Sequence, residues 1–306
     1  MPAYSTKQTM SPVIPPVLHR ALAALILLGL LAGPAAAADC QVSPARAIVD
    51  RILDLRPADA ERLVDAWAAQ RPDDPMVDFY RALTVLGEAY VDEYAPREPY
   101  WQRALRHLKR AISRAGGDRE EAALGPRQRL VVGMAESFRG LILLARGNKL
   151  QAYQAAWRGR NMLEDLVGSH PELADAYVVL GIYEYFTGSA PPAERRKLRL
   201  AGMDGDAALG VSYLEQAIEQ APVMAPEAAR ILLMEVKRDE TESCRYVPLA
   251  RDMARRYPHN RPLQLLARVV ALECRVAREE GLPVDEPLPL AIHDGCGGGL
   301  IMTRQP

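Results

Sequence analysis

Residues 171–222 constrain the fold most strongly, because small and large apolar residues recur in this stretch at helical spacing. Tyr177 and Gly181 fall on one face of a helix that Gly188 should end, since residues three or four apart lie one above another. The following segment repeats a small, large, small, proline order in Gly210, Leu214, Ala217 and Pro222. Small residues let two backbones approach and the large residue fills the gap between them. The stretch therefore predicts two closely packed antiparallel helices.

The same order of residue sizes recurs twice upstream. One copy is Ala104, Leu108 and Ala111, closed by Gly116 and Gly117, and the other is Gly159, Leu163, Leu166 and Pro171. Gly140 and Gly147 are seven residues apart, as are Gly181 and Gly188, so we align these two pairs. Three copies in register predict a helical-repeat solenoid, in which each helix pair packs on its neighbours.

Helical patterns punctuated by Gly, Pro and Asp continue from residue 43 to residue 280, and no window shows sustained period-two alternation. The expected helices are 43–55, 59–70, 75–94, 98–115, 126–146, 149–168, 172–187, 206–220, 226–238, 243–257 and 262–280. We therefore expect an all-α, right-handed solenoid of about five helix pairs at 74–281. An N-terminal helical cap at 39–73 should precede it, and a flexible tail at 282–306 should follow.

Four segments between residues 74 and 275 carry a resemblance to known proteins: LGIYEYF, GDAALGVSYLEQA, PEAARILL and ARRYPHNRP. Together with the glycine, leucine and proline spacing, they are similar to the tetratricopeptide repeat (TPR). They also resemble a family of exported bacterial TPR-like proteins of unassigned function. The resemblance implies a concave surface, built by the first helix of each pair, that takes a peptide or a partner protein. It implies no catalytic residue.

One element departs from the repeat pattern, because 187–206 is an insertion between the two helices of a pair. It contains a basic run, namely Arg195, Arg196, Lys197 and Arg199. Insertions in repeat proteins lie on one edge and often carry recognition. A short additional helix with a solvated basic face is the alternative interpretation.

Residues 1–38 have the pattern of a secretory signal peptide. Lys7 and Arg20 supply positive charge, 21–31 is an apolar run, and 36–38 is a small-residue cleavage site before Asp39. We therefore expect a periplasmic or secreted protein, cleaved near Ala38. A retained membrane anchor and a lipid on Cys40 are less favoured alternatives, since Asp39 stands where a lipoprotein has a small residue.

Charge and motifs exclude several classes of function. The chain has 38 Lys and Arg against 39 Asp and Glu, without a basic stripe, which argues against nucleic-acid binding. We expect no cofactor, because the chain contains neither a phosphate-binding glycine loop nor a histidine pair spaced for zinc. His293, Asp294 and Cys296 could ligate a metal, but no second ligand group follows at zinc spacing, so a flexible tail is the simpler interpretation.

Four cysteines follow the signal segment, and an even number suits an oxidising compartment. Cys244 and Cys274 each lie 15 residues from His259, where the last predicted hairpin turns. Antiparallel helices would place these two cysteines side by side, so we predict a disulfide between them. Whether Cys40 and Cys296 pair with each other stays open.

The leading functional hypothesis is a non-catalytic periplasmic module that binds a protein or a peptide. Tyr177 should lie in the core, whereas Tyr183 or Tyr185 should face the groove or the insertion. The expected partner-binding residues are Tyr80, Arg139, Tyr183, Tyr185, Arg195, Arg196, Arg199 and Arg230. One alternative is a hydrolase of cell-envelope glycan or peptide that uses Glu184 and Asp206 as its carboxylates. Another is an envelope scaffold anchored by lipid on Cys40.

Overall fold

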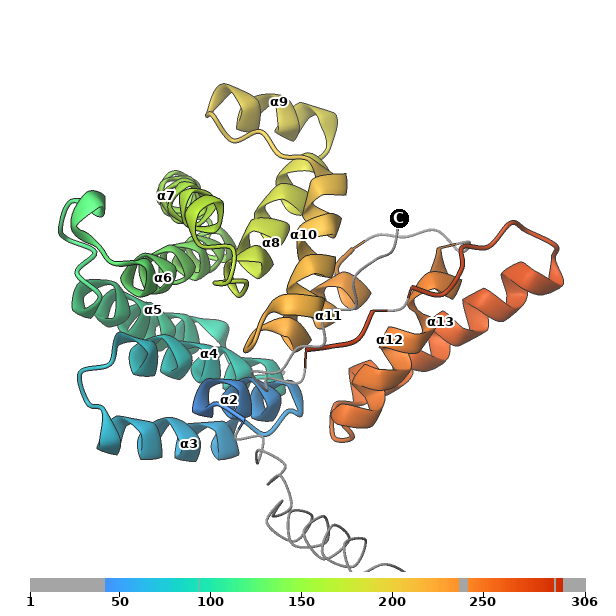
Figure 1. Ribbon diagram of the computed structural model, residues 1–306, viewed down its shortest axis with the longest axis horizontal. Coiled ribbons are helices and arrows are strands. Elements are labelled where there is room, and N and C mark those ends of the chain that lie inside the picture. The colour runs from blue at the N-terminus through green and yellow to red at the C-terminus, as the bar shows by residue number, and fades with distance from the viewer. Residues whose placement is uncertain (1–41, 93, 237–241, 289, 294–306) are drawn as a thin grey trace, which may run out of the picture. The chain divides into compact units, whose positions relative to one another are not determined.

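The computed structural model describes residues 42–92, 94–236, 242–288 and 290–293 (Figure 1). Across these ranges the chain is all-helical, with twelve α-helices, one 3-10 helix and no strand. This confirms the predicted all-α class. The predictions for the signal segment 1–38, and those for Asp39, Cys40, Asp294 and Cys296, lie outside the described residues.

The helix bounds follow the predicted pattern, and each of the eleven predicted ranges overlaps one helix. In chain order the α-helices are α2 (Pro44–Leu53), α3 (Pro57–Gln70), α4 (Pro75–Val91), α5 (Arg97–Arg114), α6 (Pro126–Ala145), α7 (Lys149–Ser169), α8 (Ala176–Gly188), α9 (Pro192–Leu200), α10 (Ala207–Gln220), α11 (Ala225–Met234), α12 (Ser243–Arg256) and α13 (Arg261–Glu279). The 3-10 helix η1 covers Glu121–Ala123. Helices α2 and α3 lie in the range 39–73, where the sequence predicts an N-terminal helical cap.

Capping side chains mark the starts of α4 and α10. The Asp74 carboxylate accepts a hydrogen bond from the Met76 amide at 3.0 Å, and Pro75 occupies the first turn of α4. Asp206 caps α10 in the same way, accepting from the amides of Ala208 and Leu209 at 2.8 and 3.2 Å. These caps begin both helices within one residue of the predicted positions.

Consecutive helices pack as pairs, and two of the pairs cross at glycines. A Cβ atom added to Gly133 of α6 would lie 2.6 Å from Cγ of Leu163 in α7. A Cβ atom added to Gly181 of α8 would lie 2.8 Å from Cγ of Leu214 in α10. Both distances are shorter than real Cβ contacts, so only glycine allows these two pairs to approach so closely. The two crossings are equivalent, which supports a helical repeat.

The structure corrects the alignment of the glycines by one seven-residue step. Gly140 approaches the backbone of α7, since an added Cβ atom would lie 3.1 Å from the Ala152 carbonyl. Gly188 approaches the start of α10 in the same manner. Gly133 and Gly140 therefore correspond to Gly181 and Gly188. Gly147 instead follows the end of α6 with φ +80°, a conformation that favours glycine, and an added Cβ atom there would meet nothing within 4 Å.

The insertion forms the extra helix α9, which has no buried residue and lies beyond the ends of α8 and α10 (Figure 1). Met203 is buried and holds the returning segment to the body. Arg195 donates a hydrogen bond to the Gly188 carbonyl at 3.2 Å, and Arg199 pairs with Asp204 at 3.4 Å. The insertion therefore contains a short additional helix on which Arg196 is exposed, and its role in recognition stays a prediction.

The C-terminal segment differs from the predicted flexible tail over the residues that the structure describes. The Leu288 amide donates to the Arg245 carbonyl, and the His293 amide donates to the Ile218 carbonyl, both at 2.9 Å. Ile292 is buried. An apolar side chain and two backbone hydrogen bonds therefore attach this segment to α10 and α12. The sequence suggested a flexible tail because the residues that follow, 297–299, are glycines.

Cys244 of α12 and Cys274 of α13 form a disulfide, with an S–S distance of 2.01 Å and a Cα–Cα distance of 4.6 Å. This confirms the prediction made from their equal spacing around His259. Because Cα atoms lie about 2.3 Å from a helix axis, this Cα separation is compatible with the ordinary distance of about 8–10 Å between two helix axes. The bridge therefore fits ordinary packing of α12 on α13.

Candidate functional site

Five helices, called here the inner helices, are α2, α4, α6, α8 and α11. The first four are the first helices of packed pairs, whereas α11 packs more on α10 than on α12. The inner helices contact one another in chain order, and α11 also contacts α2. An open solenoid would leave its last inner helix far from its first. Here the contact between α11 and α2 joins the last inner helix to the first.

A cavity of about 430 Å³, called here the inner pocket, lies among these helices. Its walls are mostly apolar and come from α2, α4, α5, α6 and α11: Val49, Ile52, Leu83, Leu86, Tyr90, Trp101, Phe138, Leu141, Ile142, Met224 and Met234. Tyr90 and Leu141 are nearly half exposed, so the pocket opens to solvent beside them. Its volume falls within the roughly 300–1,000 Å³ of typical ligand pockets.

One wall of the inner pocket is charged. Arg230 makes a bidentate pair with Glu227, with Nη2–Oε1 and Nε–Oε2 distances of 2.8 and 2.9 Å, and its Nη1 lies 3.4 Å from Glu235 Oε1. Burial lowers the pKa of Arg230, but Glu227 and Glu235 together outweigh it and leave the pKa raised. Two carboxylates against one guanidinium give this wall a net charge of 1 − 2 = −1.

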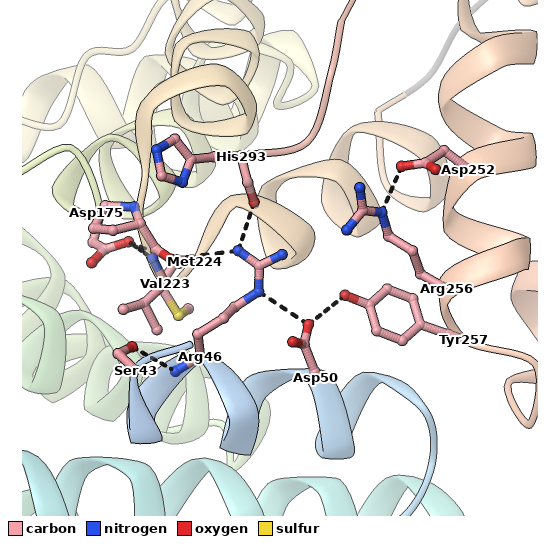
Figure 2. A network of polar contacts seen from close by, with 11 residues as sticks. Ser43, Arg46, Asp50, Asp175, Val223, Met224, Asp252, Arg256, Tyr257 and His293 are labelled. Atoms are coloured by element: carbon pink, nitrogen blue, oxygen red, sulfur yellow. Dashed lines mark hydrogen bonds and ion pairs between the residues drawn. The ribbon is translucent and has the colours of Figure 1, made fainter. Parts of the chain in front are cut away.

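Arg46 of α2 joins α2 to the C-terminal half of the chain (Figure 2). Its side chain is 2% exposed. Its Nη1 donates to the carbonyls of His293 and Pro222, at 2.8 and 3.4 Å, and its Nε donates to Asp50 Oδ1 at 3.1 Å. The Tyr257 hydroxyl donates to the same Asp50 oxygen at 2.7 Å. A single buried guanidinium thus connects three segments far apart in sequence.

A second set of contacts joins the end of α2 to the α12–α13 turn. His259 donates its amide to Asp54 Oδ1 at 3.0 Å, and its Nδ1 lies 2.7 Å from Asp54 Oδ2. Asn260 Nδ2 donates to the Leu53 carbonyl at 2.6 Å. Asn260 also lines the inner pocket. The closure between α2 and the C-terminal half therefore forms part of the pocket wall.

Asp175 fixes the start of α11 from the neighbouring pair. Its Oδ1 accepts hydrogen bonds from the amides of Val223 and Met224, at 3.1 and 2.8 Å, in a buried position (Figure 2). Burial raises the pKa of Asp175, although these two amides and the charge of Arg46 act in the opposite direction. The carboxylate thus positions the helix that carries the charged wall.

A second cavity, of about 360 Å³, lies beside Asp78 on α3, α4 and α5. Asp78 pairs with Arg110 and Arg114, at 3.0 and 2.8 Å, while Arg81 pairs with Asp65 at 2.8 Å. Burial raises the pKa of Asp78, but hydrogen bonds from His107 and Arg110 outweigh it and leave the pKa lowered. The arginines of this cavity are therefore already paired with carboxylates.

Of the expected partner-binding residues, Arg230 lies in the wall of the inner pocket. Arg139 is on α6, but it pairs with Glu136 at 2.6 Å and does not line the pocket. The arginines of the insertion lie on α9, which contributes no residue to either cavity. The structure therefore does not bring the eight expected residues together.

Three tyrosines expected in the groove are buried, and these assignments are corrected. Tyr80 is fully buried and packs edge-on against Phe79, because α4 is covered on almost every side. Tyr183 is buried under the Arg160 guanidinium, 5.5 Å from its ring centroid, and burial raises its pKa to about 12. Tyr185 is buried where α8 meets Gly210. The half-exposed member of the cluster is Phe186, while Tyr177 is buried as predicted.

Glu184 and Asp206 lie close together, but each carboxylate has a structural partner. Glu184 is buried and accepts from the Asp206 amide at 3.0 Å, and its other oxygen lies 3.3 Å from Arg160. The Asp206 carboxylate caps α10. Neither residue lines the inner pocket or the Asp78 cavity.

The aromatic residues of the inner pocket were missed by sequence reasoning. Tyr90, Trp101 and Phe138 stand on three different helices, and nothing in their spacing connects them. The sequence of α4 does contain a signal. Leu83, Leu86 and Tyr90 are spaced by three and four residues, so they form one apolar stripe on a helix whose other faces are also largely apolar. That stripe indicates a helix covered on both sides.

The described ranges contain no group of three or more His, Cys, Asp or Glu side chains placed to hold a metal ion. Across the same ranges, none of the helices combines the length and hydrophobicity that crossing a bilayer requires. No protein-family model matches the chain, and no curated protein or solved structure matches it either. The class of protein therefore has to be argued from the helix packing and the inner pocket.

Proposed function

We propose that this chain is a right-handed TPR-like solenoid that works in the periplasm as a non-catalytic binding module for a protein or peptide. The observation that carries the proposal is the inner pocket, because it is open to solvent, mostly apolar and built by the helices that present the binding surface in such solenoids. Equivalent glycine crossings in α6–α7 and α8–α10 support the repeat class.

The chemistry of the pocket favours a partner that inserts one large apolar side chain and carries a positive charge next to it. The apolar walls would bury the anchor, and burying a large side chain contributes about 1.5–3 kcal/mol. The net charge of −1 at Glu227, Arg230 and Glu235 favours an adjacent lysine or arginine. Glu235 supplies the exposed carboxylate for that contact.

The periplasmic location rests on two features. The pattern of residues 1–38 is typical of a secretory signal peptide, and the Cys244–Cys274 disulfide is typical of an oxidising compartment. Mass spectrometry of the protein recovered from cells tests this directly: a chain beginning at Asp39 fits the proposal. A lipid mass on Cys40 would instead favour the envelope-scaffold alternative.

The binding experiment starts from a random peptide library displayed on phage and selected on the purified protein. We expect the selected peptides to share a large apolar residue next to a basic one. Their affinity, measured by isothermal titration calorimetry, should fall at least about tenfold in Leu141→Asp, since a charge would stand in the pocket mouth. The matched control is Leu150→Asp, on an exposed leucine of α7 that lines neither cavity.

Two outcomes would count against this binding site. The first is a set of selected peptides without an apolar anchor, and the second is equal affinity for Leu141→Asp and the parent protein. Repeating the selection on a deletion of residues 189–204 tests the insertion as the recognition element. The deletion joins neighbouring ends, because a Cβ atom on Gly188 would lie 2.9 Å from the Gly205 carbonyl.

The hydrolase alternative has less support, because Glu184 and Asp206 already serve a buried ion pair and a helix cap. It remains testable with cell-envelope glycan and peptide substrates. Hydrolysis that is lost in both Glu184→Gln and Asp206→Asn would favour the enzyme. The asparagine variant keeps an oxygen that can cap α10, so a loss of activity there would not reflect unfolding.

A further inference from the structure

Helix α13 has two apolar faces, and only one of them is used within the described chain. Leu263, Val270, Cys274 and Ala277 are buried on the face that packs on α12, and α12 is the helix that α13 contacts most. Figure 1 shows these two helices side by side at the C-terminal end of the helical body. The other face carries Leu265, Val269 and Leu272, which are 63%, 39% and 48% exposed. A half-exposed apolar stripe on the last helix of a repeat body is a surface that a partner would cover.

The three exposed residues, extended by the partly buried Val276, follow the spacing of a coiled-coil seam. Leu265, Val269, Leu272 and Val276 are separated by four, three and four residues, which places Leu at both d positions and Val at both a positions of a heptad. β-branched residues at a combined with leucine at d favour two parallel strands. The seam ends at Pro262 on one side and at Glu279 on the other. The pattern therefore specifies a second helix of the same kind as partner.

The charges beside the seam select the same partner and its direction. Arg268 and Arg275 occupy g positions, and Glu273 and Glu280 occupy e positions five residues later. In a parallel pair of α13 helices each g residue faces the e residue five positions on in the other copy, so both contacts join opposite charges. In an antiparallel pair g would face g and e would face e, and like charges would meet.

These charged residues are available for such contacts. Arg268, Arg275 and Glu280 are exposed, and within the described residues none of them makes an ion pair. Glu273 accepts a hydrogen bond from the Ser243 hydroxyl at 2.6 Å through one oxygen, which leaves its other oxygen to accept a second. The complementary charges thus stand unused beside the exposed apolar stripe.

We propose that the chain forms a parallel homodimer through α13, with Leu265, Val269, Leu272 and Val276 of two copies packed against each other. The seam covers fewer than two heptads, so the dimer should be weak and its population should depend on protein concentration. This dimer is independent of the inner pocket, because no residue of α13 lines that pocket. Each copy would therefore keep its own binding site.

Sedimentation velocity over a concentration series of the purified protein is the first test. We expect a shift from monomer toward dimer as concentration rises, and a shift of at least tenfold to higher concentration for Leu265→Glu and for Leu272→Glu. Both leucines are exposed, so both variants should fold, which circular dichroism checks. Leu150→Glu, which changes a leucine on α7 that is more exposed than either, should dimerise like the parent protein.

Charge exchange tests the partner and its orientation. Arg275→Glu alone and Glu280→Arg alone should each weaken dimerisation, and a one-to-one mixture of the two should restore it as a heterodimer. Leu272→Cys, in a background with Cys40→Ser and Cys296→Ser, should oxidise to a disulfide-linked dimer because the d positions of two parallel copies adjoin. A protein that stays monomeric throughout the series overturns the proposal. A dimer that persists in both Leu265→Glu and Leu272→Glu also overturns it, and so does a dimer in which Leu272→Cys does not form the intermolecular disulfide.

Discussion

Gly210 lies at the closest crossing of α8 and α10, where an added Cβ atom would lie 2.4 Å from the Tyr185 amide nitrogen. A backbone atom cannot move aside as the end of a flexible side chain can. We expect Gly210→Ala to lower the free energy of unfolding by about 2–3 kcal/mol, since overpacking forces the two helices apart. Guanidinium unfolding followed by circular dichroism measures the change.

Gly168 of α7 is the matched control, because an added Cβ atom there would meet nothing within 4 Å. Gly168→Ala should leave stability unchanged or raise it by up to about 1 kcal/mol, as alanine favours a helix over glycine. Equal effects of the two substitutions would show that the α8–α10 crossing is less tight than its geometry indicates.

Asp175 predicts a pH dependence of stability. Burial raises the pKa of this carboxyl above its ordinary value of 3.8, so ionisation disfavours the folded state. Its contribution to stability is therefore fully present below pH 3.8 and is lost as the pH rises through the folded-state pKa. Asp175→Asn keeps an oxygen that can accept from Val223 and Met224 but cannot ionise. We expect this variant to match or exceed the parent protein in stability at pH 7.5.

The stability difference between Asp175→Asn and the parent protein should shrink at pH 4, where the parent carboxyl is increasingly protonated. Urea unfolding of both proteins at the two pH values measures it. Asp175→Ala should be less stable than the parent at both pH values by about 1–3 kcal/mol, because two buried amides lose their acceptor. An asparagine variant that loses stability steeply toward neutral pH would contradict the proposed sign.

At the scale of the element, the α12–α13 hairpin depends on its disulfide. Cys244 and Cys274 are 30 residues apart in sequence, and closing a loop of that length stabilises a chain by about 3–4 kcal/mol. The Cys244→Ser, Cys274→Ser double variant should therefore unfold at a clearly lower guanidinium concentration. Reducing the disulfide of the parent protein should lower its unfolding midpoint to that of the double variant. A change in the midpoint of the double variant on adding the reductant would implicate other cysteines.

The helices could be predicted from the sequence because their signals are local. Proline, capping aspartate and glycine mark the ends of α4, α8 and α10, and these marks act on the backbone within one turn. The alignment of the repeats failed by one step because Gly133, Gly140 and Gly147 recur at seven residues. That spacing fits two registers equally well, and packing against Leu163 decides between them.

The site residues were harder to predict, because helix periodicity finds a buried face but does not say how many faces are covered. Tyr80 and Tyr183 were assigned to a groove on the assumption that each first helix leaves one face open. In the structure α4 and α8 are covered nearly all round, so both rings are buried. Arg230 lies in the wall of the inner pocket, since α11 keeps a charged face toward it, and its role in partner binding stays a prediction.

At the scale of the whole described body, the closure of α2 onto the C-terminal half could not be predicted. Its contacts join residues more than 200 positions apart, such as Asp50 with Tyr257 and Asp54 with His259. No periodicity encodes a pairing over that distance. Open repeat arrays depend on nearest-neighbour contacts alone. Contacts between the first and last inner helices should make the unfolding of this chain more cooperative than that of an open array.

Arg46 is the residue on which this closure depends, and Arg46→Met tests it. Methionine keeps an unbranched apolar stem in the buried position but loses the hydrogen bonds to Asp50, Pro222 and His293. We expect a loss of about 2–3 kcal/mol in stability, since hydrogen bonds from a charged group are removed. Hydrogen exchange should accelerate most in α2 and in residues 290–293, and should change little in α6 and α7, which do not contact Arg46.

The control is Arg62→Met, which removes an exposed pair with Asp59 on α3 and should leave exchange in α2 unaltered. Equal acceleration in all helices would mean that Arg46 stabilises the fold as a whole, and that the closure is not a separable element of it.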